Sequence, residues 1–365
     1  MKIVDIDKLK ENTSANFGRT YQQCSMSVLD TIADPYITFN EEGICNYYEK
    51  YKKAVEQFNI DSDTKEADLS KLIEKIKKDG AAKKYDCISG VSGGVDSTYT
   101  VYLMYKLGLR PLIVHFDNGW NSELAVKNIE NIIEKTGFDL YTLVVDWDEF
   151  KDLQRSYFKA SVVDIEVPTD HAIRGTLSKL ALKYNIKYII SGDNVVTENV
   201  LPPYWIFNKS DHTNIKSIHK RYGTLPLKTF PFYDYKLKKL EKINNVEIIA
   251  LLNYFNYNKA EAKEIIKNEM NWKDYGGKHY ESIFTKFYQA YILPRKFNID
   301  KRKAHLSNLI FSGQISKEEA LLELKMPLYN EKDLIADYEF VIKKLNFSEA
   351  EFEDILNQPR PHPPP

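Results

Sequence analysis

Few cysteines and no excess of positive charge are the first features of this sequence. The 365 residues include 3 Cys, too few for a disulfide framework, which favours a reducing cytoplasmic setting. Lys and Arg number 51 against 52 Asp and Glu, and this net charge of −1 argues against a nucleic-acid partner. No apolar run approaches the roughly 20 residues of a membrane helix, and the start MKIVDIDKLKEN lacks a signal-peptide core. We therefore expect a cytoplasmic protein without nucleic-acid or membrane partners.

Two common phosphate-binding motifs are also missing, namely G-x-x-x-x-G-K-[ST] and G-x-G-x-x-G. The run SGGVDS at residues 92–97 stands in their place, between an apolar stretch at 85–90 and a helical pattern at 96–107. Adjacent glycines let backbone N–H groups converge on an anion at a helix N-terminus, although an ordinary glycine-rich turn has the same composition. The run resembles the pyrophosphate loop of the PP-loop ATP pyrophosphatases. The predicted ATP-binding residues of this loop are Ser92, Gly93, Gly94, Val95, Asp96 and Ser97.

Strand-like and helix-like segments alternate along the middle of the chain. We predict strands at 85–90, 111–117, 139–145 and 187–191, and helices at 96–107, 122–136 and 170–184. The fold class is therefore α/β, with a parallel sheet that has helices on both faces, plus a mainly helical C-terminal domain. The predicted domains are an N-terminal appendage (1–80), an ATP-binding domain (81–235), a helical domain (236–345) whose pattern is helical throughout, and a short helix with a proline-rich tail (346–365).

Polar residues at the ends of two later strands extend the predicted site. In the PP-loop superfamily these positions line the adenosine pocket and hold magnesium, which implies ATP contacts for Asp117 and Gly192. The resemblance likewise implies that Asp96 and Glu198 hold Mg²⁺, which prefers hard oxygen ligands. Each carboxylate also has a simpler interpretation, since Asp117 can form an acidic turn and Asp96 or Glu198 can cap a helix.

Five ordered segments carry a closer resemblance. They are SMSVLDTIADPYITFNEEGICNYY, the loop SGGVDS, VHFDNGW, TDHAIRGTLSKLALKYNIKYIISGDN and the block from GGKHYESIFTKF to SGQISKEEAL. Together they resemble the N-acetyl sugar amidotransferases of bacterial lipopolysaccharide and flagellar glycan synthesis. The resemblance implies that the acetamido oxygen of a sugar attacks the α-phosphate of ATP and is replaced by ammonia, with release of AMP and pyrophosphate. It also implies a separate glutaminase subunit as the ammonia source.

The sequence departs from that family near its N-terminus. Members carry two CxxC pairs that suggest a structural zinc, whereas this chain keeps only Cys24 and Cys45, with Tyr21 and Tyr48 at the other two positions. A closed zinc site takes four ligands, and tyrosine is a poor substitute for cysteine. We expect no structural zinc, and tyrosines that fill the space by packing and hydrogen bonding. Cys87 lies in a predicted core strand, so none of the three thiols suits a built-in glutaminase.

Cationic residues of the distal block are the predicted substrate contacts. Lys278, His279 and Arg295 stand next to glycine or proline breaks, and they suit a carboxylate or phosphate on an acetamido sugar or nucleotide sugar. By contrast, we expect residues 301–303 (KRK) to form a solvated helix face. Arg174 is a candidate near the α-phosphate, with a surface arginine as the alternative. We assign catalytic roles to Asp96, Ser97 and Arg174.

Two other functions fit the same loop. A tRNA-modifying PP-loop enzyme of the thiolation type needs a reactive cysteine or an iron–sulfur cluster and a basic RNA-binding face, and the sequence offers neither. A non-catalytic nucleotide sensor needs no acidic metal ligands, so the presence of Asp96 and Glu198 weighs against it.

Overall fold

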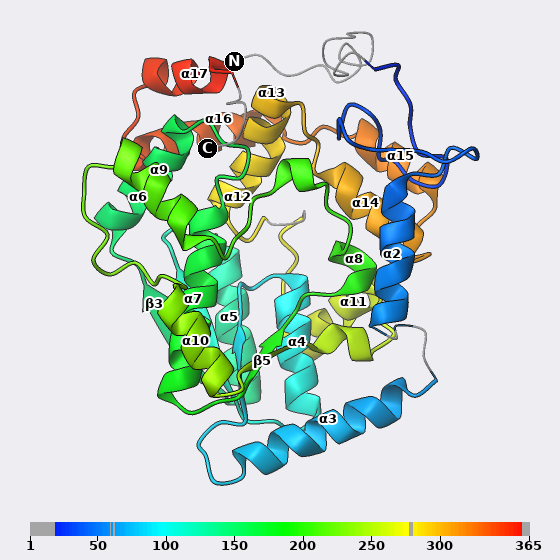
Figure 1. The fold of residues 1–365 in the computed structure, drawn as a ribbon, viewed down its shortest axis with the longest axis vertical. Helices are drawn as coiled ribbons and strands as arrows, with labels where there is room; N and C mark the ends of the chain where they lie inside the picture. Colours follow the sequence, from blue (N-terminus) through cyan, green and yellow to red (C-terminus); the bar gives the residue numbers. More distant parts are fainter. Residues whose placement is uncertain (1–18, 59, 61–62, 277–279, 360–365) are drawn as a thin grey trace.

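The computed structural model describes residues 19–58, 60, 63–276 and 280–359, and Figure 1 shows how they fold. A sheet of five parallel strands lies at the centre, in the order β3-β2-β1-β4-β5. The strands are β1 (Cys87–Gly90), β2 (Pro111–Asp117), β3 (Asp139–Val144), β4 (Tyr188–Ser191) and β5 (Glu247–Ala250). The predicted α/β class with a parallel sheet is confirmed. Among the described residues, no helix has the length and apolar character needed to cross a bilayer.

The strand order places a crevice next to β1. The chain runs from β1 to β2 and β3 on one side, and later to β4 and β5 on the other side. Ile88 of β1 therefore lies beside Leu112 of β2 and Ile189 of β4. Loops that leave β1 and β4 diverge at their carboxyl ends, which is where ligands bind in open parallel sheets.

Alternate residues of the central strands pack against helices on opposite faces of the sheet. Ile88, Leu112 and Ile189 pack with α7 (Val167–Lys183). Cys87, Ile113 and Ile190 share a core with α4 (Val95–Lys106) and α5 (Glu123–Thr136). This period of two follows from strand geometry, and it confirms the prediction of helices on both faces.

Other helices surround this three-layer centre. The sequence pattern of residues 1–80 predicts helices near 44–59 and 66–79, and the structure has α2 (Asn46–Gln57) and α3 (Lys65–Gly80) there. The sequence patterns missed α6 (Trp147–Lys159) and α9 (His212–Tyr222), which pack against each other. The side chains of Asp146 and Asp211 cap these two helices by accepting from backbone N–H groups.

The expectation that residues 236–345 are helical throughout is wrong in one place. The strand β5 lies in this region and pairs with β4, so it completes the sheet. It is short and lies in the run VEIIALL, which is apolar except for Glu247, and in such a short run periodicity does not separate a strand from a helix. The remaining α-helices are α8 (Val195–Glu198), α10 (Tyr235–Ile243), α11 (Lys259–Met270), α12 (Ile283–Phe287), α13 (Leu293–Phe297), α14 (Arg302–Phe311), α15 (Lys317–Lys325), α16 (Glu331–Lys344) and α17 (Glu349–Asn357). The short helical turns are η1 (Pro203–Trp205), η2 (Leu251–Tyr254) and the π-helical turn η3 (Tyr288–Ile292).

The N-terminal segment and the distal helices share one apolar core. It contains Cys24 and Leu29 from the start of the described chain, together with Phe284 and Phe352 from α12 and α17. In Figure 1, α16 and α17 lie at the end of the molecule opposite α3. The core runs across the predicted domain limits, which themselves stay a prediction.

Candidate active site

The loop between β1 and α4 has the geometry of an anion cradle. Gly93 has a φ of +80°, and Gly94 stands at the N-cap of α4 in an extended conformation without a side-chain cap. The hydroxyls of Ser92 and Ser97 lie 3.1 Å apart, and the Gly94 N–H donates to Ser92 Oγ at 3.2 Å. The predicted residues Ser92, Gly93, Gly94, Val95 and Ser97 are thus brought together at a helix N-terminus, where backbone N–H groups favour an anion.

Residues far away in the sequence pack against this loop. Trp272 Nε1 donates to Gly93 O at 2.8 Å. A Cβ atom on Gly93 would lie 2.5 Å from Ala125 O, at the start of α5. A Cβ atom on Gly94 would lie 3.3 Å from a carboxylate oxygen of Glu281. The loop therefore has space only for glycine at Gly93, and its shape depends on residues far away in the sequence.

Asp96 is held by two distal residues that no sequence motif indicates. Its carboxylate accepts from the hydroxyl of Tyr257 and from Lys259 Nζ, the latter at 2.8 Å. Burial lowers the pKa of Lys259, but the carboxylates of Asp96 and Glu198 outweigh burial and raise the pKa above its ordinary value. The two carboxylates therefore favour the charged form of Lys259, which lies beside Asp96, one of the predicted metal ligands.

The carboxylates of this region fit the predicted Mg²⁺. Burial raises the pKa of Asp193, and the nearby negative charges of Glu198, Asp170 and Asp96 raise it further. Lys259 beside Asp96 and Lys209 beside Asp170 offset part of this negative charge, and a divalent cation would offset the rest. Within the described ranges no cluster of three metal-ligating side chains occurs. Two carboxylates are sufficient for Mg²⁺ when phosphate oxygens and waters complete the shell, so Asp96 and Glu198 remain the predicted ligands.

The cradle opens into a cavity of about 620 Å³, which we call the loop pocket. The lining includes the predicted residues Ser92, Ser97, Arg174 and Gly192. Asp117 is absent from the lining, because its carboxylate turns back to accept from the Gly119 N–H at 2.8 Å and from Asn121 at 3.2 Å. The structure thus supports the acidic-turn interpretation of Asp117. The polar side chains at this strand end that line the loop pocket are His115, Asn118 and Asn121.

Arg174 lines the loop pocket, and its guanidinium contacts two other side chains. Its guanidinium pairs with Glu241 at 2.9 Å, donates to the Tyr233 hydroxyl at 3.2 Å and lies 4.6 Å from the centre of that ring. Within the described part of the chain its Nη1 is buried without a hydrogen-bond partner. Arg174 is therefore a partly buried arginine held by Glu241 and Tyr233, and the predicted phosphate contact stays a prediction.

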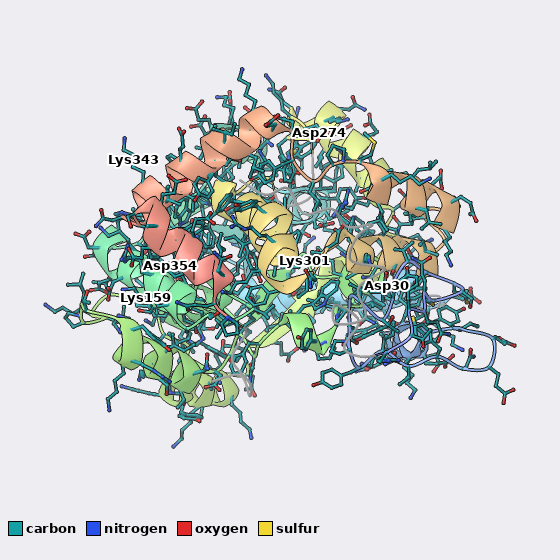
Figure 2. All side chains as sticks on the ribbon, turned by 90° about the horizontal axis from the view of Figure 1, so that it is seen from above. Asp30, Lys159, Asp274, Lys301, Lys343 and Asp354 are labelled. Carbon is teal, nitrogen blue, oxygen red and sulfur yellow. The ribbon has the colours of Figure 1, made fainter. Side chains whose placement is uncertain are left out.

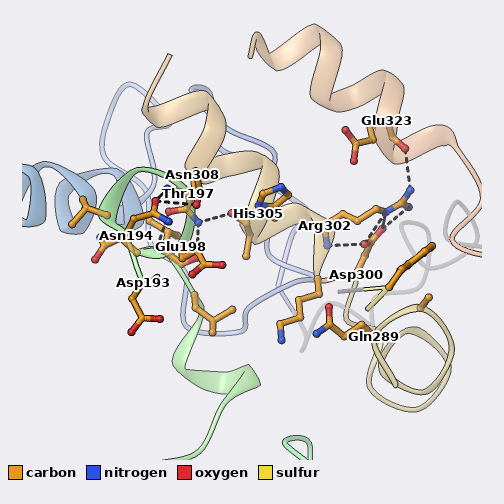
Figure 3. Close-up of a pocket in the computed structure, with 18 of the residues that line it drawn as sticks. Asp193, Asn194, Thr197, Glu198, Gln289, Asp300, Arg302, His305, Asn308 and Glu323 are labelled. Carbon is orange, nitrogen blue, oxygen red and sulfur yellow. Dashed lines mark hydrogen bonds and ion pairs between the residues drawn. The ribbon is translucent and has the colours of Figure 1, made fainter. Parts of the chain in front are cut away.

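A second cavity of about 890 Å³, which we call the distal pocket, adjoins the first. Glu198 lines it together with residues of α14 such as Arg302 and His305, as Figure 3 shows. Among the residues that the structure describes, four line both the loop pocket and the distal pocket, and they form a common wall. The shared residues are Asp170, Asp193, Gln289 and Lys301.

The structure does not place any of the three predicted substrate contacts in either pocket. Lys278 and His279 lie outside the described residues. Arg295 lines neither of the two pockets, because its guanidinium pairs with Glu353 of α17 and contacts the Tyr291 hydroxyl. The pairing lowers the pKa of the Glu353 carboxyl. Arg295 therefore links α13 to α17 through an ion pair. The structure does not support a substrate contact for Arg295.

The expectation of a solvated face at residues 301–303 is wrong. Lys301 and Arg302 line the distal pocket, and Figure 2 shows Lys301 near the centre of the face seen from above. Arg302 is fixed by Asp300 at 2.8 Å. Lys303 is buried and forms an ion pair with Asp30. The packing of α14 decides which of these three cations faces the pocket and which faces the core. A short run of like charges in the sequence does not show this.

The two N-terminal cysteines are buried neighbours. The Cys45 N–H donates to Cys24 Sγ at 3.2 Å. Tyr21 donates to Asp30 at 3.3 Å, and the Tyr48 ring lies 5.2 Å from that of Phe311. These contacts agree with the expected packing and hydrogen bonding of the two tyrosines, and the absence of zinc stays a prediction.

Comparisons with known proteins match separate parts of this chain. Residues 281–363 match the family model of "LPS biosynthesis protein WbpG-like, C-terminal domain". This match confirms the resemblance to bacterial lipopolysaccharide enzymes in the distal part of the chain. Many residues of the distal pocket belong to the matched region, including Gln289, Lys301 and His305.

Curated relatives match shorter parts. The chain is 37% identical over 76 residues to tRNA(Ile)-lysidine synthase of Chlamydia pneumoniae, which is 20% of this chain and 23% of that protein. It is 31% identical over 106 residues to one subunit of the glutamine-hydrolyzing GMP synthase of Sulfurisphaera tokodaii, 29% of this chain and 28% of that one. The chain therefore spans about a quarter of the length of each. The NH3-dependent NAD synthetase from Campylobacter jejuni aligns with a TM-score of 0.30 and 14% identity, over 73% of this chain and 99% of that chain.

Proposed function

We propose that this protein is an ATP-dependent enzyme of bacterial surface glycan synthesis that converts the acetamido group of a sugar into an acetamidino group. The PP-loop sequence and the glycine-dependent cradle support the use of an adenine nucleotide. The WbpG-like match over residues 281–363 supports a role in lipopolysaccharide synthesis. The GMP synthase relative supports a reaction that consumes ammonia, because its name is that of a glutamine-hydrolyzing enzyme.

The observation that carries the proposal is the common wall of the two pockets. The loop pocket is lined mainly by the strand ends around the cradle and by residues 166–177, and the distal pocket is lined by residues 193–201 together with many residues of the WbpG-like region. A triphosphate in the first and a sugar in the second would meet at Asp170, Asp193, Gln289 and Lys301. This arrangement suits a transfer between a nucleotide and a second substrate better than it suits a sensor of nucleotide alone.

The chemistry asks the chain mainly for positioning and electrostatic stabilisation. The acetamido oxygen attacks the α-phosphorus, the bond from that phosphorus to the bridging oxygen breaks, and pyrophosphate leaves with the electron pair. Ammonia then adds to the imidate carbon, loses a proton, and displaces AMP, which keeps the former amide oxygen. The N–H groups around Gly93 and Gly94 and the Lys259 ammonium would stabilise the departing charge, a contribution of several kcal/mol in preorganised sites. Alignment of the two substrates supplies roughly 7–11 kcal/mol in favourable cases.

Ammonia comes, in this proposal, from a separate glutaminase subunit. Cys24, Cys45 and Cys87 are at most 1% exposed, so none of the three sulfur atoms is accessible to a bound glutamine. A glutaminase nucleophile has to reach glutamine as a thiolate. We expect the purified chain to use ammonium salts and to leave glutamine intact. Appreciable glutamine hydrolysis by the chain alone would contradict the partner proposal.

A tRNA-modifying activity is the second candidate, because one relative is a tRNA(Ile)-lysidine synthase. The net charge of −1 and the buried cysteines make it the weaker of the two. One experiment separates them. The protein is incubated with ATP, Mg²⁺ and ammonium, together with either acetamido sugars, the matching free-amine sugars, or bulk tRNA, and AMP and product masses are recorded.

The proposed function predicts AMP and a small loss of sugar mass with the acetamido sugars, as oxygen is exchanged for nitrogen, and no AMP with the amine controls. AMP that depends on tRNA would favour the second candidate. ADP and orthophosphate as products would exclude both, since both cleave ATP next to the α-phosphate.

A further inference from the structure

We infer that Gln289 recognises the acetamido group of the acceptor sugar, and that the π-helical turn η3 exists to bring its amide to the junction of the two pockets. The inference rests on the proposed function and assigns a specificity residue to it. Of the described residues in the WbpG-like region, Gln289 and Lys301 line both pockets. Figure 3 shows the Gln289 amide directed into the distal pocket, across from Asp193 and Glu198.

The backbone of η3 has a local cause. Helices α12 and α13 follow one another directly through η3, and Leu293 N donates to Tyr288 O in the i to i+5 pattern. Pro294 has no N–H to offer the carbonyl of Ala290, four residues earlier, and its ring would clash with that carbonyl in a regular helix. A widened turn accommodates the ring. Such single π-turns re-aim side chains and are frequent at functional sites.

Glu166 fixes which end of the Gln289 amide faces the pocket. A carboxylate only accepts hydrogen bonds, so the amide nitrogen lies on the Glu166 side, with Nε2 3.5 Å from Glu166 Oε2. Glu166 is itself held by the Thr285 hydroxyl at 2.6 Å. The carbonyl oxygen Oε1 is therefore turned away from Glu166 and is available as an acceptor at the common wall.

An acceptor at this position matches the chemistry of an acetamido group. Its oxygen has to point towards the α-phosphate in the loop pocket, so its N–H points away from the nucleotide, towards the distal side. As the oxygen attacks phosphorus, the nitrogen lone pair moves towards carbon and the N–H becomes a stronger donor. A hydrogen bond to Oε1 thus strengthens during the reaction, which is the kind of interaction that raises the rate rather than only the affinity. The negative charge of Glu166 polarises the amide in the same direction.

The test compares Gln289→Met with Gln358→Met. Methionine keeps an unbranched chain of the same length and removes the acceptor and donor. Gln358 follows α17, and its backbone N–H and carbonyl form its hydrogen bonds to Asp354, Ile355 and Lys296. Steady-state AMP formation is measured with the best acetamido sugar of the panel, and thermal unfolding checks both folds. In Gln289→Met we expect kcat/KM for the sugar to fall roughly 10- to 100-fold, because the acetamido N–H of the bound sugar is left without a hydrogen-bond partner. The KM for ATP should stay within about twofold of that of the wild-type protein.

A positioning role for Glu166 gives a second readout. Glu166→Gln allows the Gln289 amide to turn either way, so we expect kcat for the sugar to fall while the KM for ATP is kept. Unchanged kcat/KM for the sugar in Gln289→Met, with AMP formation by the wild-type protein intact, would overturn the inference and leave the proposed function standing.

A second experiment covers a failure of the reaction itself. Saturation-transfer NMR follows the acetyl methyl signal of N-acetylglucosamine and of its UDP conjugate. A methyl signal lost in Gln289→Met without any AMP formation would support recognition by Gln289 and overturn the reaction. No methyl signal and no AMP in the unchanged protein would overturn both.

Discussion

The cradle can be tested by adding a single methyl group at Gly93. Its φ of +80° lies in the left-handed region, in which a side chain is unfavourable by about 1–2 kcal/mol. The added Cβ would also lie 2.5 Å from Ala125 O, and this backbone atom is held in the first turn of α5. Overpacking of this kind destabilises by about 1–3 kcal/mol more. Gly137 is a matched control, because its φ is +68° and no atom lies within 4 Å of its added Cβ.

We therefore expect Gly93→Ala to lower the free energy of unfolding by about 2–5 kcal/mol, and Gly137→Ala by only about 1–2 kcal/mol. Urea unfolding followed by circular dichroism measures both. Calorimetric titration with ATP and Mg²⁺ measures binding, which we expect to be lost in Gly93→Ala and kept in Gly137→Ala. If both variants unfold at the same urea concentration and bind ATP equally well, the close approach of the loop to α5 does not shape the nucleotide site.

Charged and titratable side chains allow three further tests. Asp96→Asn should reduce AMP formation by at least about 100-fold with unchanged circular dichroism, because a neutral amide binds Mg²⁺ far less well; wild-type activity would remove Asp96 from the site. Lys303→Met should lower the free energy of unfolding by about 3–5 kcal/mol in urea, since Asp30 is left charged in the core, and adding Asp30→Asn should restore part of the loss. Burial lowers the pKa of His171 below the ordinary 6.5, and its Nε2 accepts from the Tyr233 N–H. Below pH 6.5 the unfolded chain thus binds a proton that the folded chain does not, so stability falls with falling pH, and a pH series of unfolding midpoints should show a shallower fall in His171→Gln.

The part of the fold that the sequence predicts is the part set by local patterns. The strand at 111–117 and the helix around 123–136 are specified by apolar spacing, the Ser122 cap and Gly137 at the C-cap, so their bounds agree closely with the structure. The strand β5 has only four residues and no such punctuation. Its place at the sheet edge is decided by pairing with β4, which is a long-range contact.

The candidate site divides in the same way. The loop residues are recognisable because consecutive residues form one structural unit. Tyr257 and Lys259 are brought to Asp96 by the docking of α11 against α4, and no spacing in the sequence relates segments this far apart. Arg295 shows the opposite error. It stands beside a proline break, as a functional residue often does, but Glu353 is close enough to neutralise it only in the folded chain.

The bond from Trp272 to Gly93 spans 179 residues of sequence, and it has a consequence for synthesis on the ribosome. A nascent chain that has just exposed the SGGVDS run still lacks the indole that braces it, and it lacks Lys259 and the fifth strand as well. Nucleotide capture should therefore begin abruptly and late during translation, when most of the polypeptide has emerged. Premature termination before that point would yield fragments that carry the motif and bind no ATP.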